Sequence, residues 1–141
     1  NGGMIAGTSA GAAVMSEKMI TGNQIKSVLE GGGFQVIERQ NVQLANGLGL
    51  IKSAIIDQHF VKRSRYNRLL TLSIENPDLK CIGIDESTAI IVAGNMVRVV
   101  GSSQVLVFDA QGIKAKVKGE KLGQSGLKLS VYLDGDTFSL Q

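Results

Sequence analysis

The residues best suited to chemistry stand near the start of the chain, in the run Gly7-Thr8-Ser9-Ala10-Gly11. Small residues on both sides of one hydroxyl allow a sharp turn, so we expect Ser9 Oγ at the point where a strand gives way to a helix. The G-x-S-x-G spacing is typical of a nucleophile elbow. A serine hydroxyl is a poor nucleophile near neutral pH, and it needs a neighbouring base to take its proton. The sequence therefore predicts a nucleophilic serine with a base beside it.

The chain contains one histidine, His59, and we expect it to be that base. Imidazole ionises near neutral pH, which suits a group that takes and returns a proton. A carboxylate can fix the tautomer of the imidazole and stabilise its cation, and Glu86 is predicted for this role. The amide of Ala10 follows the nucleophile and is expected to donate to an oxyanion. Simpler interpretations stay open. The G-x-S-x-G motif can arise by chance in a chain with 18 glycines, His59 can be an ordinary surface histidine, and Asp85-Glu86-Ser87 can be a simple turn.

Three predicted strands would bring these side chains together. A buried strand over residues 4–8 leads into Ser9, and a short helix follows it to about Ser16. Residues 53–57 and 80–85 form two more apolar strands, and the histidine and the glutamate come directly after them. In open α/β sheets, sites lie outside the carboxyl ends of the strands. We therefore expect the hydroxyl, the imidazole and the carboxylate to converge at one edge of a sheet.

The rest of the pattern changes from α/β to strands. A helix is predicted over residues 65–75, and Asn76-Pro77 ends it. Residues 20–50 are expected to be an irregular loop facing the substrate, with a short helical turn within 20–29, glycines at 31–33 and a short strand over 34–38. Strand–helix–strand units predict parallel pairing with right-handed crossovers. Late strands, joined by turns, are predicted over residues 89–93, 96–100, 104–108, 127–133 and 137–140.

Composition limits the function classes. The 141 residues are 43% hydrophobic and 19% charged, as in one globular domain, and no apolar run approaches the roughly 18 residues of a membrane span. The net charge of +3 is modest and aromatic residues are 4%, so nucleic-acid binding is not expected and the late lysines (114, 116, 118, 121 and 128) indicate a solvated face. Cys81 is the one cysteine, which excludes an intrachain disulfide and a cysteine metal cluster. We expect a reducing, cytoplasmic compartment.

The order of the candidates separates this chain from several enzyme classes. In this chain the acidic residue follows the histidine in the sequence, whereas in α/β-hydrolases the acidic residue precedes the histidine. Glutamine amidotransferases carry a cysteine at the elbow, and N-terminal-nucleophile hydrolases need Ser, Thr or Cys at residue 1, where this chain has Asn. Arg63, Arg65 and Arg68 follow the histidine, and guanidinium groups bind carboxylates in a bidentate manner. They indicate a substrate with a free carboxylate, with a solvated basic helix face as the alternative.

Five segments together resemble the cyanophycinase family of serine exopeptidases, which is related to aspartyl dipeptidase. The resemblance covers about residues 1–110 and rests on Gly7-Thr8-Ser9-Ala10-Gly11-Ala12, Gly47-Leu48-Gly49-Leu50, Ile56-Asp57-Gln58-His59-Phe60, the arginine series with Leu69-Leu70, and Gly83-Ile84-Asp85-Glu86-Ser87-Thr88-Ala89. It implies a three-layer αβα sandwich akin to class I glutamine amidotransferases, with a mostly parallel sheet and late β-hairpins. It also implies an acyl-enzyme mechanism with Ser9 as nucleophile, His59 as base and Glu86 as its acidic partner.

The substrate implied by the resemblance is cyanophycin, a polyaspartate with arginine on each side-chain carboxyl, which is cleaved to β-Asp-Arg dipeptides. The matching pocket positions are Asp57, Gln58, Arg63, Arg65 and Arg68. The resemblance implies no metal and no cofactor, and a homodimer. Family members carry a further α/β segment before the elbow, so residues 1–141 are expected to be the C-terminal part of one catalytic domain. The alternatives are an exopeptidase for short Asp peptides and an inactive truncated relative.

Overall fold

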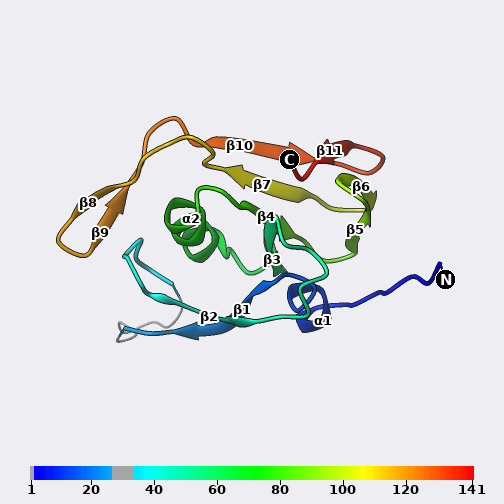
Figure 1. Cartoon of the computed structure of the whole chain (residues 1–141), viewed down its shortest axis with the longest axis horizontal. Coiled ribbons are helices and arrows are strands. Elements are labelled where there is room, and N and C mark those ends of the chain that lie inside the picture. Colours follow the sequence, from blue (N-terminus) through cyan, green and yellow to red (C-terminus); the bar gives the residue numbers. More distant parts are fainter. Residues whose placement is uncertain (1, 27–33) are drawn as a thin grey trace.

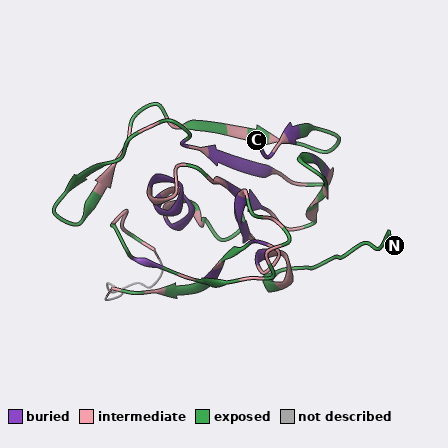
Figure 2. Cartoon of the chain, in the orientation of Figure 1, coloured by how far each residue is buried: buried purple, intermediate pink, exposed green. Residues whose placement is uncertain are grey.

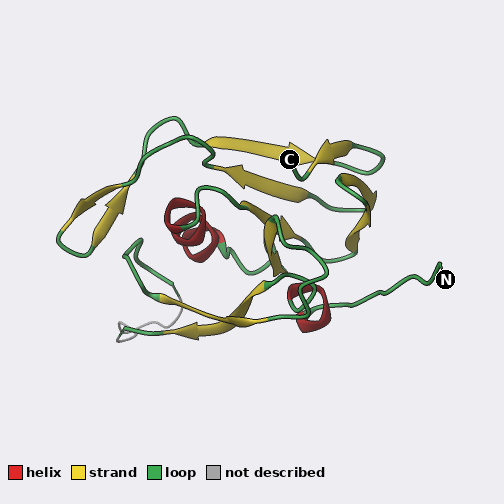
Figure 3. Ribbon diagram, viewed as in Figure 1, coloured by secondary structure: helices red, strands yellow, loops and turns green. Residues whose placement is uncertain are grey.

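The structure, a computed structural model, describes residues 2–26 and 34–141. It is a mixed α/β fold made mostly of strands (Figures 1 and 3). The helices in the described residues are α1 (Ala10–Ala13) and α2 (Tyr66–Glu75). The strands are β1 (Lys18–Gln24), β2 (Val42–Asn46), β3 (Ala54–Gln58), β4 (Lys80–Ile84), β5 (Thr88–Ala93), β6 (Met96–Gly101), β7 (Val105–Asp109), β8 (Lys116–Lys118), β9 (Lys121–Gly123), β10 (Lys128–Tyr132) and β11 (Thr137–Ser139).

A four-stranded sheet in the order β10-β7-β4-β3 forms the centre of the fold. Strands β3 and β4 are parallel and are joined through α2, as predicted, whereas β7 is antiparallel to β4 and β10 is antiparallel to β7. The prediction of a mostly parallel sheet is therefore wrong for the described residues. After β4 the chain makes the β5–β6 hairpin instead of a helical crossover, so it re-enters the sheet from the end at which it left.

The two faces of the central sheet bury different residues, because successive side chains of a strand point to opposite faces. Ile56 and Ile82 pack in a cluster with β6, β7 and β11, whose three-stranded sheet has the order β11-β6-β5. Ile55 and Cys81 pack in a second cluster with α2 and the β1–β2 pair. Figure 2 shows the buried residues concentrated in β3, β4, β7 and α2. Strands β3, β4 and β7 are thus covered on both faces, which explains why they are largely apolar, whereas the edge strand β10 is mostly exposed.

The predicted strand over residues 4–8 is not formed. Met4 and Ile5 are 88% and 65% exposed, and the segment extends away from the body of the molecule (Figure 1). A strand needs a neighbouring strand to satisfy its backbone donors and acceptors, and in the part of the chain that the structure describes no strand pairs with this segment. Its apolar sequence is therefore not sufficient to make it a strand.

Residues 18–24 and 42–46 also differ from the expectation of an irregular loop. Strands β1 and β2 pair antiparallel, with a break in register between Ile20 and Gln24. The helical turn expected within residues 20–29 is therefore wrong over 20–24, while 27–29 and the glycines at 31–33 lie outside the described residues. The strand expected over 34–38 is reduced to one isolated bridge between Glu38 and Lys121.

The helix predicted to reach about Ser16 ends at Ala13. The other elements agree with the sequence patterns to within one or two residues. Strands β3 to β7, β10 and β11 and helix α2 are confirmed. The pair β8–β9 was not predicted, although the exposure of its lysines was. No helix among residues 2–26 and 34–141 has both the length and the apolar character that a membrane crossing requires.

Candidate functional site

Ser9 lies in a strained turn at the start of α1. Its φ of 54° and ψ of −120° are unusual for a residue with a side chain, and such strain is typical of functional sites. Gly7 makes the turn possible, because a Cβ there would lie 2.2 Å from the carbonyl oxygen of Gly11. The amide of Gly11 donates to the carbonyl of Thr8 at 2.8 Å. The elbow conformation expected from the sequence is present.

The three predicted side chains meet in one hydrogen-bonded chain. Ser9 Oγ lies 2.9 Å from His59 Nε2, and His59 Nδ1 lies 2.9 Å from Glu86 Oε1. The imidazole is 26% exposed and the Glu86 side chain 41%. With its proton on Nδ1 the ring donates to Glu86, which leaves Nε2 free to accept the proton of the Ser9 hydroxyl. This arrangement can activate a serine for attack on a carbonyl carbon.

The parallel pairing of β3 and β4 positions the imidazole and the carboxylate. Gln58 and Ile84 are register partners at the carboxyl ends of these strands, so the residues that follow them emerge side by side. Phe60 anchors the loop after β3: its ring is fully buried, and its amide donates to the carbonyl of Ile84 at 3.2 Å. A Cβ on Gly83 would lie 2.3 Å from Cγ of Phe60, so the ring lies directly on β4 only because residue 83 is glycine.

A cavity of about 1030 Å³ adjoins the three side chains. It is bordered by residues 3–9, by Gln58 and His59, and by residues 84–93, which include Glu86 and β5. Gln58 Oε1 is buried and has no hydrogen-bond partner among the described residues. A buried acceptor of this kind is costly to leave unpaired. The cavity thus combines apolar walls with a reactive hydroxyl, and the side chain of Gln58 lies at its border.

The other predicted pocket residues are Asp57, Arg63, Arg65 and Arg68, and the residues that border this cavity do not include them. Asp57 is 1% exposed and forms an ion pair with Arg68, which is itself buried; Arg68 Nε donates to Asp57 Oδ2 at 2.6 Å. Arg65 donates to the carbonyl of Gln58 at 2.6 Å. Burial and the nearby charge of Arg68 lower the pKa of Arg65, against the opposing effect of Asp57. Arg63 is exposed, and the role of these four residues toward a substrate stays a prediction.

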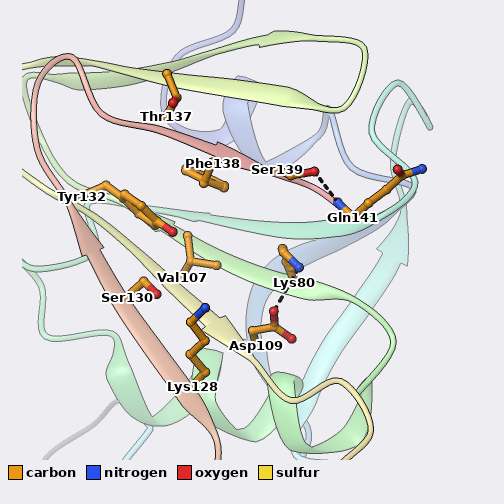
Figure 4. Close-up of a pocket in the computed structure, with 10 residues that line it drawn as sticks. All are labelled: Lys80, Val107, Asp109, Lys128, Ser130, Tyr132, Thr137, Phe138, Ser139 and Gln141. Atoms are coloured by element: carbon orange, nitrogen blue, oxygen red, sulfur yellow. Dashed lines mark hydrogen bonds and ion pairs between the residues drawn. The ribbon is translucent and has the colours of Figure 1, made fainter.

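A second, smaller cavity of about 290 Å³ is bordered by residues of β7, β10 and β11 and by Lys80 (Figure 4). Lys80, which begins β4, forms an ion pair with Asp109 at 3.0 Å beside it, and Lys128 and Tyr132 of β10 also border it. None of the predicted site residues lines it. Within the described residues there is no group of three or more His, Cys, Asp or Glu side chains that could hold a metal ion. Cys81 is buried in the sheet, and this burial raises the pKa of its thiol.

Sequence reasoning gave no role to Asp85, whose carboxylate lies between the loops that carry His59 and Glu86. The signal available in the sequence was its place directly before Glu86. Its partners are distant in the chain, so the contacts themselves could not be predicted.

Comparison with known proteins places the chain in a family. The model of peptidase family S51 matches residues 1–100. The chain belongs to peptidase family S51. Ser9, His59 and Glu86 all lie within the matched part of the sequence.

Curated relatives of this S51 chain are named cyanophycinases. The chain is 36% identical to cyanophycinase from Synechococcus elongatus over 144 residues, which is 98% of the chain and 42% of the relative. It is 37% identical to that from Trichormus variabilis, covering 96% and 45%, and 36% identical to that from Geminocystis herdmanii, covering 96% and 49%. The chain therefore spans less than half the length of these relatives.

Proposed function

We propose that the protein is a serine peptidase of family S51 that hydrolyses cyanophycin. The observation that carries the proposal is the continuous hydrogen-bonded chain from Ser9 Oγ through His59 to Glu86. The serine and the histidine are 50 positions apart in the sequence, and the histidine and the glutamate are 27 apart. They meet in the order that nucleophilic catalysis requires. The elbow conformation of Ser9 and the adjoining cavity support it.

In the first half of the reaction, His59 Nε2 takes the proton of Ser9 while Oγ bonds to the scissile carbonyl carbon. The carbonyl oxygen becomes an oxyanion, and the amide of Ala10 is the donor proposed to stabilise it. The C–N bond then breaks, and His59 gives its proton to the leaving amine, which leaves an acyl ester on Ser9. Water, deprotonated by His59, cleaves the ester in the second half and restores the hydroxyl. Glu86 holds the ring and stabilises its cation in both halves.

The names of the curated relatives support cyanophycin as the substrate. Cyanophycin carries an arginine on every aspartate, and Gln58, which borders the cavity, is proposed to contact it. Arg63 is exposed, its amide donates to the carbonyl of His59 at 3.0 Å, and it is proposed to receive a substrate carboxylate. Asp57, Arg65 and Arg68 are proposed to contribute to substrate recognition by supporting the segment that carries Gln58 and His59. The product would be the β-Asp-Arg dipeptide, with no metal or cofactor in the reaction.

We also propose that residues 1–141 act as the C-terminal part of one catalytic domain with a three-layer αβα arrangement. Residues 3–8 border the cavity without a strand partner in the described structure, and β3 and β5 are edge strands of their sheets. A companion segment paired with residues 3–8 and with the β5 edge would complete the site, and the greater length of the curated relatives supports this proposal. We further propose that the protein is a homodimer and acts in the cytoplasm.

Release of β-Asp-Arg from cyanophycin by the full-length protein tests the proposal. Ser9→Ala and His59→Gln should each abolish release and should prevent labelling of residue 9 by a serine-directed phosphonylating reagent. Ser125→Ala, at an exposed position in the loop before β10, is the matched control and should behave as the wild type. Undiminished release by Ser9→Ala would refute the assignment of the nucleophile. Turnover of Asp dipeptides without turnover of cyanophycin would refute the substrate.

A further inference from the structure

Asp85 lies where three loops meet, at the end of the central sheet where β3 and β4 finish and β7 begins. Its Oδ1 accepts a hydrogen bond from the amide of Lys62 at 2.9 Å, in the loop after His59. Its Oδ2 accepts from the hydroxyl of Ser103 at 2.6 Å, in the loop that leads into β7. Asp85 is itself the first residue of the loop that carries Glu86. One carboxylate therefore joins the histidine loop, the glutamate loop and the β6–β7 loop.

The topology explains why these loops can share one side chain. Strands β3 and β4 end at this edge, while the antiparallel strand β7 begins there, with Val105 opposite Ile84. The amide of Asp85 donates to the carbonyl of Gln104 at 3.1 Å, which extends the ladder by one bond. The carboxylate then reaches across both neighbouring strands, which no backbone group at this position could do.

The carboxylate is well supplied with donors. Its partial burial alone would raise its pKa, but hydrogen bonds from the Ser103 hydroxyl and from the amides of Lys62, Glu86 and Val61 outweigh burial and hold the pKa of Asp85 below its usual range. Asp85 is therefore ionised at neutral pH and accepts from both loops continuously.

The loops it joins are strained, so they need such support. His59 and Ser87 both have positive φ values, 50° and 54°, which non-glycine residues adopt only when surrounding contacts enforce them. A second link runs parallel to the first: Thr88 Oγ1 donates to the carbonyl of Glu86 at 3.2 Å and accepts from the amide of Ser103 at 2.9 Å. Neither link includes a member of the proposed triad side chains.

We propose that Asp85 is a positioning residue that sets the distance between His59 and Glu86. The inference rests on the proposed function, since it concerns the same imidazole–carboxylate pair. Asp85 acts through the loops and not on the substrate: it fixes the backbone from which the imidazole and the Glu86 carboxyl project. Loss of its links should loosen the 2.9 Å contact between them and leave substrate binding intact.

The side chain offers a graded series of variants. Asp85→Asn keeps one oxygen to accept from Lys62, and its amide can donate to Ser103 because a hydroxyl both donates and accepts. Asp85→Ala removes both links, and Ser103→Ala removes one. The expected order of activity is therefore wild type, then Asp85→Asn, then Ser103→Ala, then Asp85→Ala. Asp78→Ala, an exposed aspartate before β4 at the opposite end of the sheet, is the control.

The first measurement is steady-state hydrolysis of cyanophycin by the full-length protein. Asp85→Ala should lower kcat by about 10- to 100-fold, the scale expected when reacting groups are displaced by up to an ångström. KM should be unchanged, because uniform binding is not affected. Asp78→Ala should match the wild type. A fall confined to KM, or wild-type kcat in Asp85→Ala, would overturn the proposal.

The second measurement does not depend on activity. A proton shared between imidazole Nδ1 and a carboxylate gives a far-downfield resonance in ¹H NMR, and its absence from His59→Gln assigns it. The resonance should weaken in Ser103→Ala, disappear in Asp85→Ala and persist in Asp85→Asn. Its persistence in Asp85→Ala would refute the positioning role even if the wild type did not hydrolyse cyanophycin, so the two proposals fail separately.

Discussion

Gly83→Ala offers a sharp test of how the fold places the histidine. The new Cβ would lie 2.3 Å from Cγ of Phe60 and 2.5 and 2.6 Å from its two Cδ atoms. Ordinary contacts of this kind are about 3.5–4.0 Å, so the ring or strand β4 must move by roughly 1 Å. The ring has little freedom, because it is fully buried and makes edge contacts with Tyr66 and Phe108 at centroid distances of 5.0 and 5.9 Å.

The expected loss of stability follows from this overlap. Inserting a methyl group into a well-packed core costs about 1–3 kcal/mol. Replacing glycine with alanine where the backbone conformation allows it returns about 0.4–1 kcal/mol through the unfolded chain. The net destabilisation should therefore be about 1–2 kcal/mol. Because Phe60 directly follows His59, displacement of the ring should also lower kcat, by up to about 100-fold for a shift of 1 Å.

Urea denaturation and cyanophycin hydrolysis measure the two effects. Gly123→Ala is the matched control: it also lies in a strand, its φ suits alanine, and the nearest atom to its Cβ is 3.9 Å away. It should stay within about 0.5 kcal/mol of the wild type. If Gly83→Ala were as stable and as active as Gly123→Ala, the reasoning that Phe60 anchors the histidine loop against β4 would be refuted.

Three further predictions concern charge and burial. Arg68→Ala should destabilise the protein by about 3 kcal/mol in urea, because it removes both hydrogen bonds from the guanidinium to the buried Asp57 carboxylate. Arg65 Nη1, 3.6 Å from Asp57 Oδ1, then remains as the ion-pair partner. The exposed Arg63→Ala should change stability by less than about 0.5 kcal/mol, and equal effects would contradict the importance of the buried pair. Cys81 should not react with Ellman's reagent in the native protein but should react after denaturation, since burial raises the pKa of its thiol; rapid native labelling would show that the sheet opens there. The pKa of Asp85 is lower in the folded state, so the stabilisation it provides is present above the ordinary carboxyl pKa of about 3.9 and is lost as the pH falls below it. The difference in urea midpoint between wild type and Asp85→Ala should therefore shrink in acid, and a constant difference would contradict this sign.

The sequence predicted those elements whose pattern is local. Strands β3 and β4 are apolar runs bounded by polar residues, and α2 ends at Asn76-Pro77 where the pattern indicates. The elbow at Ser9 was predictable because its turn depends on neighbouring small residues. The meeting of His59 and Glu86 follows from one rule, that sites gather at the carboxyl ends of parallel strands. Ser9 reaches them although the strand predicted before it is not formed in the described structure.

The errors concern interactions that a local pattern does not contain. The direction of β7 depends on the β5–β6 hairpin, which returns the chain to the edge it left. Strand β8 reads Lys-Val-Lys and is exposed throughout, so it lacks the alternation that marks a half-buried strand. Residues 4–8 have an apolar strand composition but lack a hydrogen-bond partner in the described structure. The contacts of Asp85 were not predictable, because its partners Lys62 and Ser103 lie 23 and 18 positions away in the sequence.

One further consequence concerns Ser16, the residue through which the elbow segment is held to the central sheet. Its buried hydroxyl oxygen accepts from the amide of Ile56 at 3.2 Å, and its backbone bridges Ile51, so a side chain occupies a place on the β3 edge where a strand would otherwise bond. The segment that carries the nucleophile is thus bonded to β3 through the Ser16 hydroxyl. The strands that precede His59 and Glu86, β3 and β4, are instead joined by a continuous parallel ladder of hydrogen bonds. On heating, amide exchange at Ile56 should accelerate before exchange in β4 does, and inactivation should precede the global melting transition.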